Sequence, residues 1–334
     1  MKYPLLIFLN FVISISFAQL EAIFDLKRFD SSKEPYIETY LLIYGNTLTD
    51  DNDSIEPKKS IEVLQYIEDE NNEIISHKKY HITEDADYVI KNNIIDLKRF
   101  SIPYGYYKIY LEIKDLNNPD KITYHQQEFD LSFSNTLNFS DIEFIDSYWK
   151  ANDESELTKS GIEIVPLVSN YFSSEFEKLA YYFEVYGTDQ IKDETEFLLK
   201  QSIRINGSDE IAGQYNRVKK YKATEVIPVL NTFDINNLPT GNYDLTIELV
   251  NSKNEILITL KTPFQRTNLN NNINLNRLNA VDISNTFASY LPKDSLLDFM
   301  QCLTPLASTL ELNIIDKKAK KINDTLKRQF IFSF

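Results

Sequence analysis

The stretch Leu238–Leu249 reads LPTGNYDLTIEL, and the earlier stretch Ile102–Ile113 reads IPYGYYKIYLEI. Three residue types recur in the two copies at a single offset of 136 residues: Pro103, Gly105 and Tyr107, then Pro239, Gly241 and Tyr243. Proline presets φ in a turn, and we expect the glycine to supply a positive φ before a strand of alternating character. This order is typical of a tyrosine corner, in which the tyrosine hydroxyl binds an upstream backbone group of a β-sandwich. Two copies predict two sandwiches.

The segments around both corners are short and rich in β-branched and aromatic residues. Tyr36–Tyr44 (YIETYLLIY) and Leu179–Tyr186 (LAYYFEVY) each run into a Tyr-Gly pair. Turn signals recur about every 8–12 residues, which is typical of sandwich folds. The predicted fold class is therefore mainly β, with two tandem Ig-like or fibronectin-like β-sandwiches. A single larger barrel is the alternative that the duplication disfavours.

Past the second copy the apolar period changes from that of a strand to that of a helix. Leu296, Met300 and Leu303 are spaced i, i+4, i+7, and Thr304-Pro305 resembles a helix cap and first position. A second apolar series follows at helical spacing: Ile315, Ala319, Ile322, Leu326 and Phe330. The predicted division of the chain is then 1–18 signal peptide, 19–148 first sandwich, 149–160 polar linker, 161–266 second sandwich, 267–283 Asn-rich linker and 284–334 helical tail.

The first residues and the overall charge indicate the compartment and exclude some partners. Lys2, the apolar run Leu5–Phe17 and the small residues of Ser16-Phe17-Ala18 predict a secretory signal peptide cut before Gln19, with an uncleaved anchor as the alternative. We therefore expect an exported protein that is periplasmic, outer-membrane-associated or extracellular. No later stretch approaches the ~20 apolar residues of a membrane span. A net charge of −15 disfavours nucleic acid as a partner. Cys302 is the only cysteine, so the sequence allows no intrachain disulfide.

Four phrases resemble a known family. They are YIETYLLIYG from Tyr36, LTKSGIEIVPLVSNYFSSEFEKLAYYFEVYGT from Leu157, FDINNLPTGNYDLTIEL from Phe233 and VDISNTFASYLPKDSLLDFMQCLTPLAS from Val281. Together they resemble the amino-terminal portion of secreted GWxTD-domain proteins of Gram-negative, Bacteroidetes-type bacteria. The motif itself is absent, since the only tryptophan is Trp149. The resemblance implies export and architecture but no reaction, and it makes a missing C-terminal domain one expected partner.

The sequence offers few groups with metal or modification chemistry. His77 and His81 share one face of a predicted strand, but zinc needs three or four ligands and nothing nearby supplies them by spacing. Asp51 and Asp53 present alternate oxygens for Ca²⁺ without the rest of an EF-hand pattern, so we expect a solvated loop. Ser54 fits a short bacterial O-glycosylation pattern. We assign no catalytic, cofactor-binding or metal-binding residue.

Aromatic side chains are the remaining candidates for function. Tyr104 and Tyr106 cluster at the first corner, and Tyr181 and Tyr182 are neighbours in a predicted strand, so alternate members should point outward. The candidate interaction surface consists of Tyr104, Tyr106, Phe330, Phe332 and Phe334. We expect a non-enzymatic protein that acts through protein–protein contacts in the cell envelope. A carbohydrate-binding or adhesin module is the alternative, and an accessory part of an envelope hydrolase is a third, less favoured one.

Overall fold

The structure is a computed structural model. It describes residues 20–31, 34–50, 58–83, 89–90, 93–133, 137–153, 155–191, 195–268, 283, 286–307, 312 and 314–333. Several sequence predictions lie outside these residues: the signal peptide, the loop with Asp51, Asp53 and Ser54, residues 269–282 of the Asn-rich linker, and Phe334. The chain folds as two compact units, 1–133 and 134–334. No helix among the described residues is long and apolar enough to cross a membrane.

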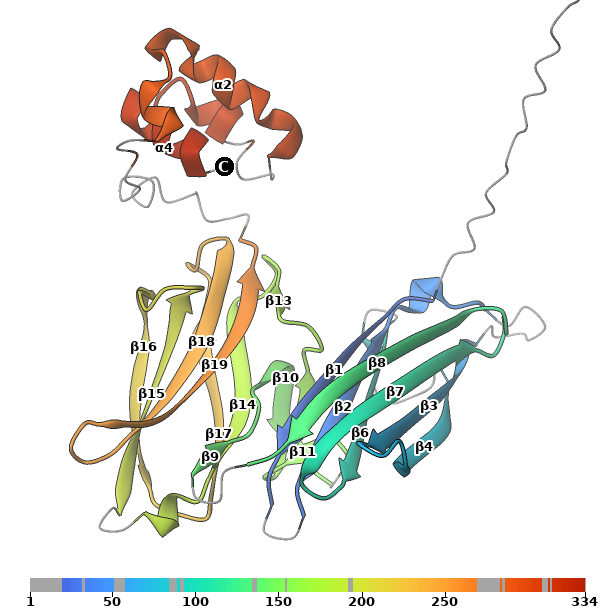
Figure 1. Cartoon of the computed structure of the whole chain (residues 1–334). Helices are drawn as coiled ribbons and strands as arrows, with labels where there is room; N and C mark the ends of the chain where they lie inside the picture. The colour runs from blue at the N-terminus through green and yellow to red at the C-terminus, as the bar shows by residue number, and fades with distance from the viewer. Residues whose placement is uncertain are drawn as a thin grey trace, which may run out of the picture. The chain divides into compact units, whose positions relative to one another are not determined.

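The first unit is a sandwich of two four-stranded sheets (Figure 1). One sheet has the order β1 (Ala22–Phe29), β2 (Tyr36–Ile43), β6 (Asn93–Ser101) and β5 (Val89–Ile90), with a single helical turn at Gly45–Thr47 after β2. The other has the order β4 (Ile74–Thr83), β3 (Ser60–Asp69), β7 (Gly105–Asp115) and β8 (Ile122–Leu131). Alternation in β3 and β7 places every second residue between the sheets, where Val63 and Ile113 belong to one buried cluster and Ile67 and Ile109 to another.

The second unit repeats this arrangement. Its larger sheet has the order β11 (Thr158–Lys159), β12 (Ile162–Pro166), β10 (Glu143–Lys150), β14 (Lys178–Tyr186) and β17 (Val226–Asp234), and β9 (Asn138–Phe139) also pairs with β14. The other sheet has the order β13 (Tyr171–Phe172), β19 (Ile256–Arg266), β18 (Gly241–Val250), β15 (Glu196–Ile205) and β16 (Ile211–Lys222). A helical turn at Thr188–Gln190 follows β14.

The strand orders confirm the predicted fold class of two tandem sandwiches. In the first unit β4-β3-β7-β8 corresponds to β16-β15-β18-β19 in the second, in the same sequence of antiparallel neighbours. A feature that the sequence reasoning missed agrees with the duplication. Gln65 and Gln201, 136 residues apart, are both fully buried at equivalent places in β3 and β15. Each glutamine pairs across the strands with a cationic residue that lies over a phenylalanine ring. Lys78, the partner of Gln65, lies over Phe100, and Arg217, the partner of Gln201, lies over Phe233.

The predicted domain boundary is wrong. The sequence interpretation ended the first sandwich at residue 148 and placed a linker without strands at 149–160. In the structure β9 and β10 pair with β14, and β11 pairs with β12, so the second unit already begins at residue 134. The physical reason is core packing, because Phe144 is buried and its ring lies edge-on to those of Phe172 and Phe264. The end of the predicted first sandwich is thus the first part of the second sandwich.

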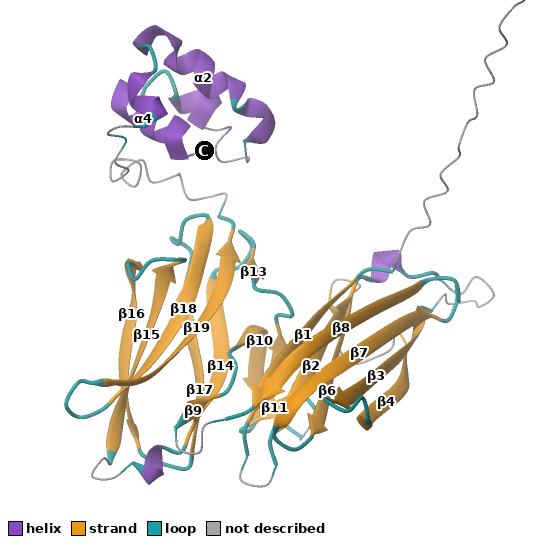
Figure 2. Cartoon of the chain, viewed as in Figure 1, coloured by secondary structure: helices purple, strands orange, loops and turns teal. Residues whose placement is uncertain are grey.

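The tail has a small core of its own, formed by helical segments (Figure 2). They are single turns at Phe287–Tyr290, Lys293–Ser295 and Thr304–Leu306, α2 (Leu296–Cys302), a wide turn at Ile314–Lys318 and α4 (Asp324–Ser333). Leu296 and Met300 are buried as the spacing predicts. Two expectations need correction. Thr304-Pro305 starts only a short turn, and the second apolar series does not form one helix, because Asn323 Oδ1 accepts the backbone N–H of Leu326 and starts α4 anew.

Candidate functional site

Both predicted tyrosine corners have the expected hydrogen bond. The Tyr107 hydroxyl donates to the carbonyl of Pro103 at 3.0 Å, and the Tyr243 hydroxyl donates to the carbonyl of Pro239 at 3.0 Å. Both rings are buried. The partial loss of water around the Tyr107 hydroxyl is the main cause that raises its pKa. The corners therefore hold the fold together and leave no free group for chemistry.

The expected role of the corner glycines is wrong. Neither Gly105 nor Gly241 has a positive φ. Glycine is required there by close approach instead: a Cβ on Gly105 would lie 2.8 Å from the Tyr107 hydroxyl oxygen, and one on Gly241 would lie 3.1 Å from that of Tyr243. The tyrosine ring fills the space in which a side chain would stand.

Tyr104 and Tyr106 are exposed, as the candidate surface requires, but they point to different partners. The Tyr104 hydroxyl donates to Asp30 Oδ1 at 2.8 Å and the Tyr106 hydroxyl to Glu128 Oε2 at 2.9 Å. Partial desolvation, followed by the bond to Asp30, raises the pKa of Tyr104 to about 12. The bond to Glu128 is the first cause of the raised pKa of Tyr106. The two tyrosines thus belong to separate hydrogen-bonded pairs.

Other predicted aromatic surfaces are partly wrong. Phe330 is buried in the tail core, at 3% exposure, while Phe332 is 39% exposed and its ring lies 6.2 Å from that of Phe287. In β14 both Tyr181 and Tyr182 are buried, although alternate residues face opposite sides. Tyr182 is covered on the outer side of its sheet, where Lys159 Nζ lies 5.2 Å from its ring centroid. A covered sheet face is a tertiary feature that alternation alone does not reveal.

The two histidines of the HKKYH segment lie at exposed positions. His77 and His81 lie on the exposed side of β4, and His81 Nε2 lies 3.0 Å from Glu62 Oε2. The bond to His81, then the one to Lys79, lowers the pKa of Glu62. Across the described ranges no three His, Cys, Asp or Glu side chains gather as a metal site would need.

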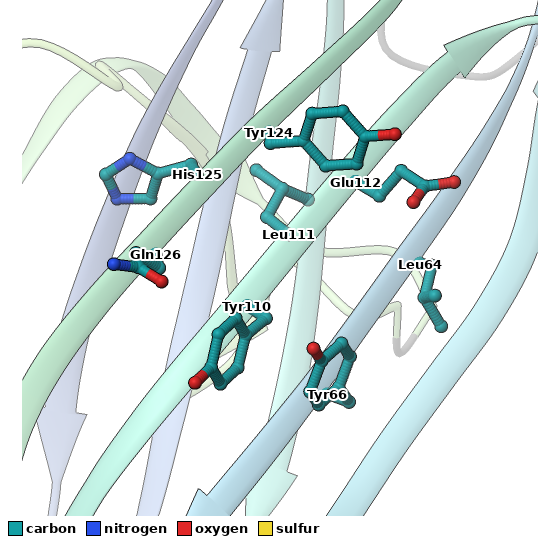
Figure 3. A pocket seen from close by; sticks show the side chains of 8 residues that line it. All are labelled: Leu64, Tyr66, Tyr110, Leu111, Glu112, Tyr124, His125 and Gln126. Carbon is teal, nitrogen blue, oxygen red and sulfur yellow. The ribbon is translucent and has the colours of Figure 1, made fainter.

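An aromatic surface that the sequence reasoning missed lies on the outer face of β3, β7 and β8. Cross-strand register sets Leu64, Glu112 and Tyr124 in one row across the three strands, and Tyr66, Tyr110 and Gln126 in the next row. These side chains line a shallow depression of about 320 Å³ (Figure 3). We call its apolar members the aromatic face: Leu64, Tyr66, Tyr110 and Tyr124.

The centre of the aromatic face is a stacked pair. The Tyr66 and Tyr110 ring centroids are 4.6 Å apart with an interplanar angle of 10°. Partial loss of water is the first cause that raises the pKa of Tyr66. Tyr124 stands 68% exposed further along the same sheet (Figure 3). The alternation of β3 is the sequence feature that could have revealed this surface. Leu64 and Tyr66 alternate with buried residues, so they occupy outward positions at which a strand facing water would have polar residues.

Charged pairs border the aromatic face on two sides. Glu62 Oε1 lies 3.0 Å from Lys79 Nζ, and Lys108 Nζ lies 3.6 Å from Glu128 Oε1. Lys108 Nζ also lies 5.7 Å from the centroid of the Tyr110 ring. The aromatic face therefore has an apolar centre with an ion pair on each of two sides.

Comparisons with known proteins add little to this geometry. No family model and no curated protein matches the chain. Among solved structures the chain is similar to red sea bream transglutaminase, at 9% sequence identity and a TM-score of 0.24. That match covers 74% of this chain and 31% of the transglutaminase chain, so the chain spans about a third of that protein. A likeness at this level supports no inference about activity.

Proposed function

We propose that this chain is an exported, non-enzymatic protein of the cell envelope that acts by binding another protein through the aromatic face of its first sandwich. The observation that carries the proposal is the stacked pair of Tyr66 and Tyr110 at the centre of a sheet face, with Tyr124 68% exposed beside it. Scattered surface tyrosines need no explanation, but adjacent ones at outward strand positions form one surface.

The anatomy of the surface supports a protein partner. Binding energy in protein interfaces concentrates in a few central residues, among which tyrosine is enriched, and a polar rim excludes water around them. Here the ring pair is preorganised by stacking, so little side-chain freedom is lost on binding. Two ion pairs form the rim: Glu62 lies against Lys79, and Lys108 lies against Glu128. The rim thus offers both signs of charge. A folded partner with a complementary flat surface fits these features.

A carbohydrate ligand is the second candidate at this surface, and the ring geometry disfavours it. Sugars bind aromatic residues against an open ring face. Tyr66 and Tyr110 cover one face of each other, and the Lys108 ammonium lies near Tyr110 as well. Of the three tyrosines of the aromatic face, only Tyr124 has no ring or cation contact with the described residues. A single open ring is a weak platform for a sugar chain.

Membership of the GWxTD-domain proteins and export are parts of the same proposal. They are supported by the four phrases that resemble that family and by the amino-terminal pattern of Lys2, an apolar run and small residues before Gln19. The expected compartment is the periplasm, the outer-membrane surface or the exterior. Amino-terminal sequencing of the protein isolated from its own cells tests export, because a mature chain that begins at Gln19 is expected.

The binding proposal is tested with purified mature chain as bait in a quantitative pull-down from envelope extract. Tyr124→Ser and Tyr110→Ser each remove a ring of the aromatic face, while Tyr290→Ser removes an exposed tyrosine of the tail and serves as the control. We expect the wild type and the Tyr290→Ser control to capture one set of proteins that Tyr124→Ser and Tyr110→Ser do not capture. A glycan array run in parallel decides the alternative. Sugar binding that depends on Tyr124, without a protein partner, would replace the proposal.

A further inference from the structure

A row of neutral side chains crosses the second sandwich near its tyrosine corner. Asn242 on β18 pairs with Gln265 on β19, and Gln265 pairs with Tyr171 on β13. The loop that follows β15 joins the row, because the backbone N–H of Asn206 donates to the carbonyl of Asn242 at 3.1 Å. We propose that this surface is a binding site for a neutral saccharide. We call it the amide row, formed by Asn170, Tyr171, Asn206, Asn242 and Gln265.

The amide row lines one shallow depression together with Pro263. Its volume of about 390 Å³ lies inside the range of about 300–1,000 Å³ that small-molecule sites occupy. The row members are all exposed, and Tyr171 is 42% exposed. The Asn206 amide is oriented by its bond to Asp244 Oδ1 at 2.8 Å. The position of that amide is therefore set before any ligand arrives.

The chemistry of the row suits sugar hydroxyls. A side-chain amide both donates and accepts hydrogen bonds, and neighbouring hydroxyls of a sugar ring do the same. Within the described residues no hydrogen bond engages the side-chain amides of Asn170, Asn242 and Gln265. Tyr171 likewise has no ring or cation contact there, so a ring face is open to the C–H face of a sugar. This is the feature that Tyr66 and Tyr110 lack.

The residues that line the depression carry no charged side chain, and this favours a neutral ligand over a charged one. Every residue that lines the depression is an amide, a tyrosine, a phenylalanine or a proline. The nearest cation in sequence, Arg266, is 1% exposed and its guanidinium donates to the carbonyls of Ser173 and Ile235. Among the residues that line the depression a uronate or phosphate group would find no counter-charge, and the Asp244 carboxylate that holds Asn206 would repel it. An extended peptide is disfavoured because β13 already pairs with the edge of β19 at this row.

The first sandwich provides an internal comparison. There the position equivalent to Asn242 is Tyr106, 136 residues earlier, and its strand partner is Asp130. The Tyr106 hydroxyl is bound to Glu128. The duplicated surface has thus become acidic in one sandwich and neutral in the other, and we expect saccharide binding only at the second.

The experiment measures binding of the full mature chain to an array of cello-, manno- and galacto-oligosaccharides, with uronic-acid oligomers as charged comparators. We expect at least one neutral series to bind. Tyr171→Ala and Gln265→Ala should each weaken that binding at least tenfold, Tyr171→Phe should retain it, and Tyr106→Ala should leave it unchanged. Hydrogen exchange of β18 and β19 identifies any variant that has lost its fold.

The outcomes that overturn the proposal are equally definite. The proposal is overturned if no neutral oligosaccharide binds, or if only the uronic-acid oligomers bind. It is also overturned if a neutral oligosaccharide still binds the variant that carries both Tyr171→Ala and Gln265→Ala. Binding of a peptide, rather than a sugar, that depends on Tyr171 in a peptide array would also overturn the proposal. None of these results bears on the aromatic face of the first sandwich, which is tested by other variants.

Discussion

At the scale of single residues, the corner glycines show how one contact determines a residue type. Glycine was expected for its conformational freedom, whereas the structure gives it a steric role beneath the tyrosine ring. The sequence spacing correctly predicted a tyrosine bond to an upstream backbone group, because hydroxyl and acceptor belong to one short turn. It could not predict why the glycine is there, since φ and ring placement are set by tertiary packing.

The first prediction concerns Gly105→Ala. We expect a loss of about 1–3 kcal/mol in the free energy of unfolding, because the new Cβ meets the Tyr107 hydroxyl at 2.8 Å. Gly241→Ala should cost less, since its nearest contact is 3.1 Å. Combining Gly105→Ala with Tyr107→Phe should recover part of the cost, which a double-mutant cycle by chemical denaturation measures. Strictly additive costs would show that ring contact is not the cause.

The second prediction concerns the titration of Tyr104, whose pKa is raised to about 12. An unfolded tyrosine ionises near pH 10. The folded state binds this proton more tightly, so its contribution to stability is complete below pH 10 and is lost as the pH rises from 10 towards 12. The difference in absorbance at 295 nm between the wild type and Tyr104→Phe should titrate near pH 12. A difference that titrates near pH 10 would contradict the desolvation of Tyr104 and its bond to Asp30.

At the scale of elements, the sequence predicted strands better than it predicted what covers them. The alternation in β3 identifies which residues face outward, yet the cross-strand neighbours that make Tyr66 and Tyr110 one surface come from register. Helical spacing identified the buried residues Ile315, Ala319 and Ile322 but not the break before α4. The spacing of apolar residues indicates which side chains are buried, whereas the residue at which a helix begins depends on capping.

The third prediction tests that cap. Asn323→Ala removes the acceptor of the Leu326 N–H and should destabilise α4 by about 1 kcal/mol. Hydrogen exchange of the amides in Asp324–Ser333, measured in the full chain, should be faster by a corresponding factor. Asn323→Asp keeps a capping oxygen and should restore slow exchange. Unchanged protection in Asn323→Ala would mean that α4 does not begin at this residue.

At the scale of the whole molecule, the chain consists of one sandwich design used twice, with additional short strands before β14 in the second copy. The duplication was readable because the corner repeats at a fixed offset. The boundary could not be predicted from the sequence, because the membership of β10 is decided by the contacts of Phe144. Local sequence cannot show which of two adjacent cores an apolar strand joins.

The fourth prediction follows from that assignment. Phe144→Ala should cost about 3–5 kcal/mol, and the whole cost should fall on the second sandwich. In hydrogen exchange with peptide resolution, β14 and β18 should lose protection while β3 and β7 keep theirs. Val63→Ala, in the first core, provides the reciprocal control. Loss of protection in β3 or β7 from Phe144→Ala would return this strand to the first sandwich.

The most direct measurement of the central claim is photo-crosslinking inside the cells that make the protein. A photoreactive phenylalanine analogue replaces Tyr124 on the aromatic face, or Tyr290 on the tail as the control, both of which are exposed. If the aromatic face binds a protein, the first position gives a discrete protein adduct that Tyr110→Ser abolishes, and the second position does not give that adduct. An aromatic face that yields no adduct, or one indifferent to Tyr110→Ser, would contradict the account.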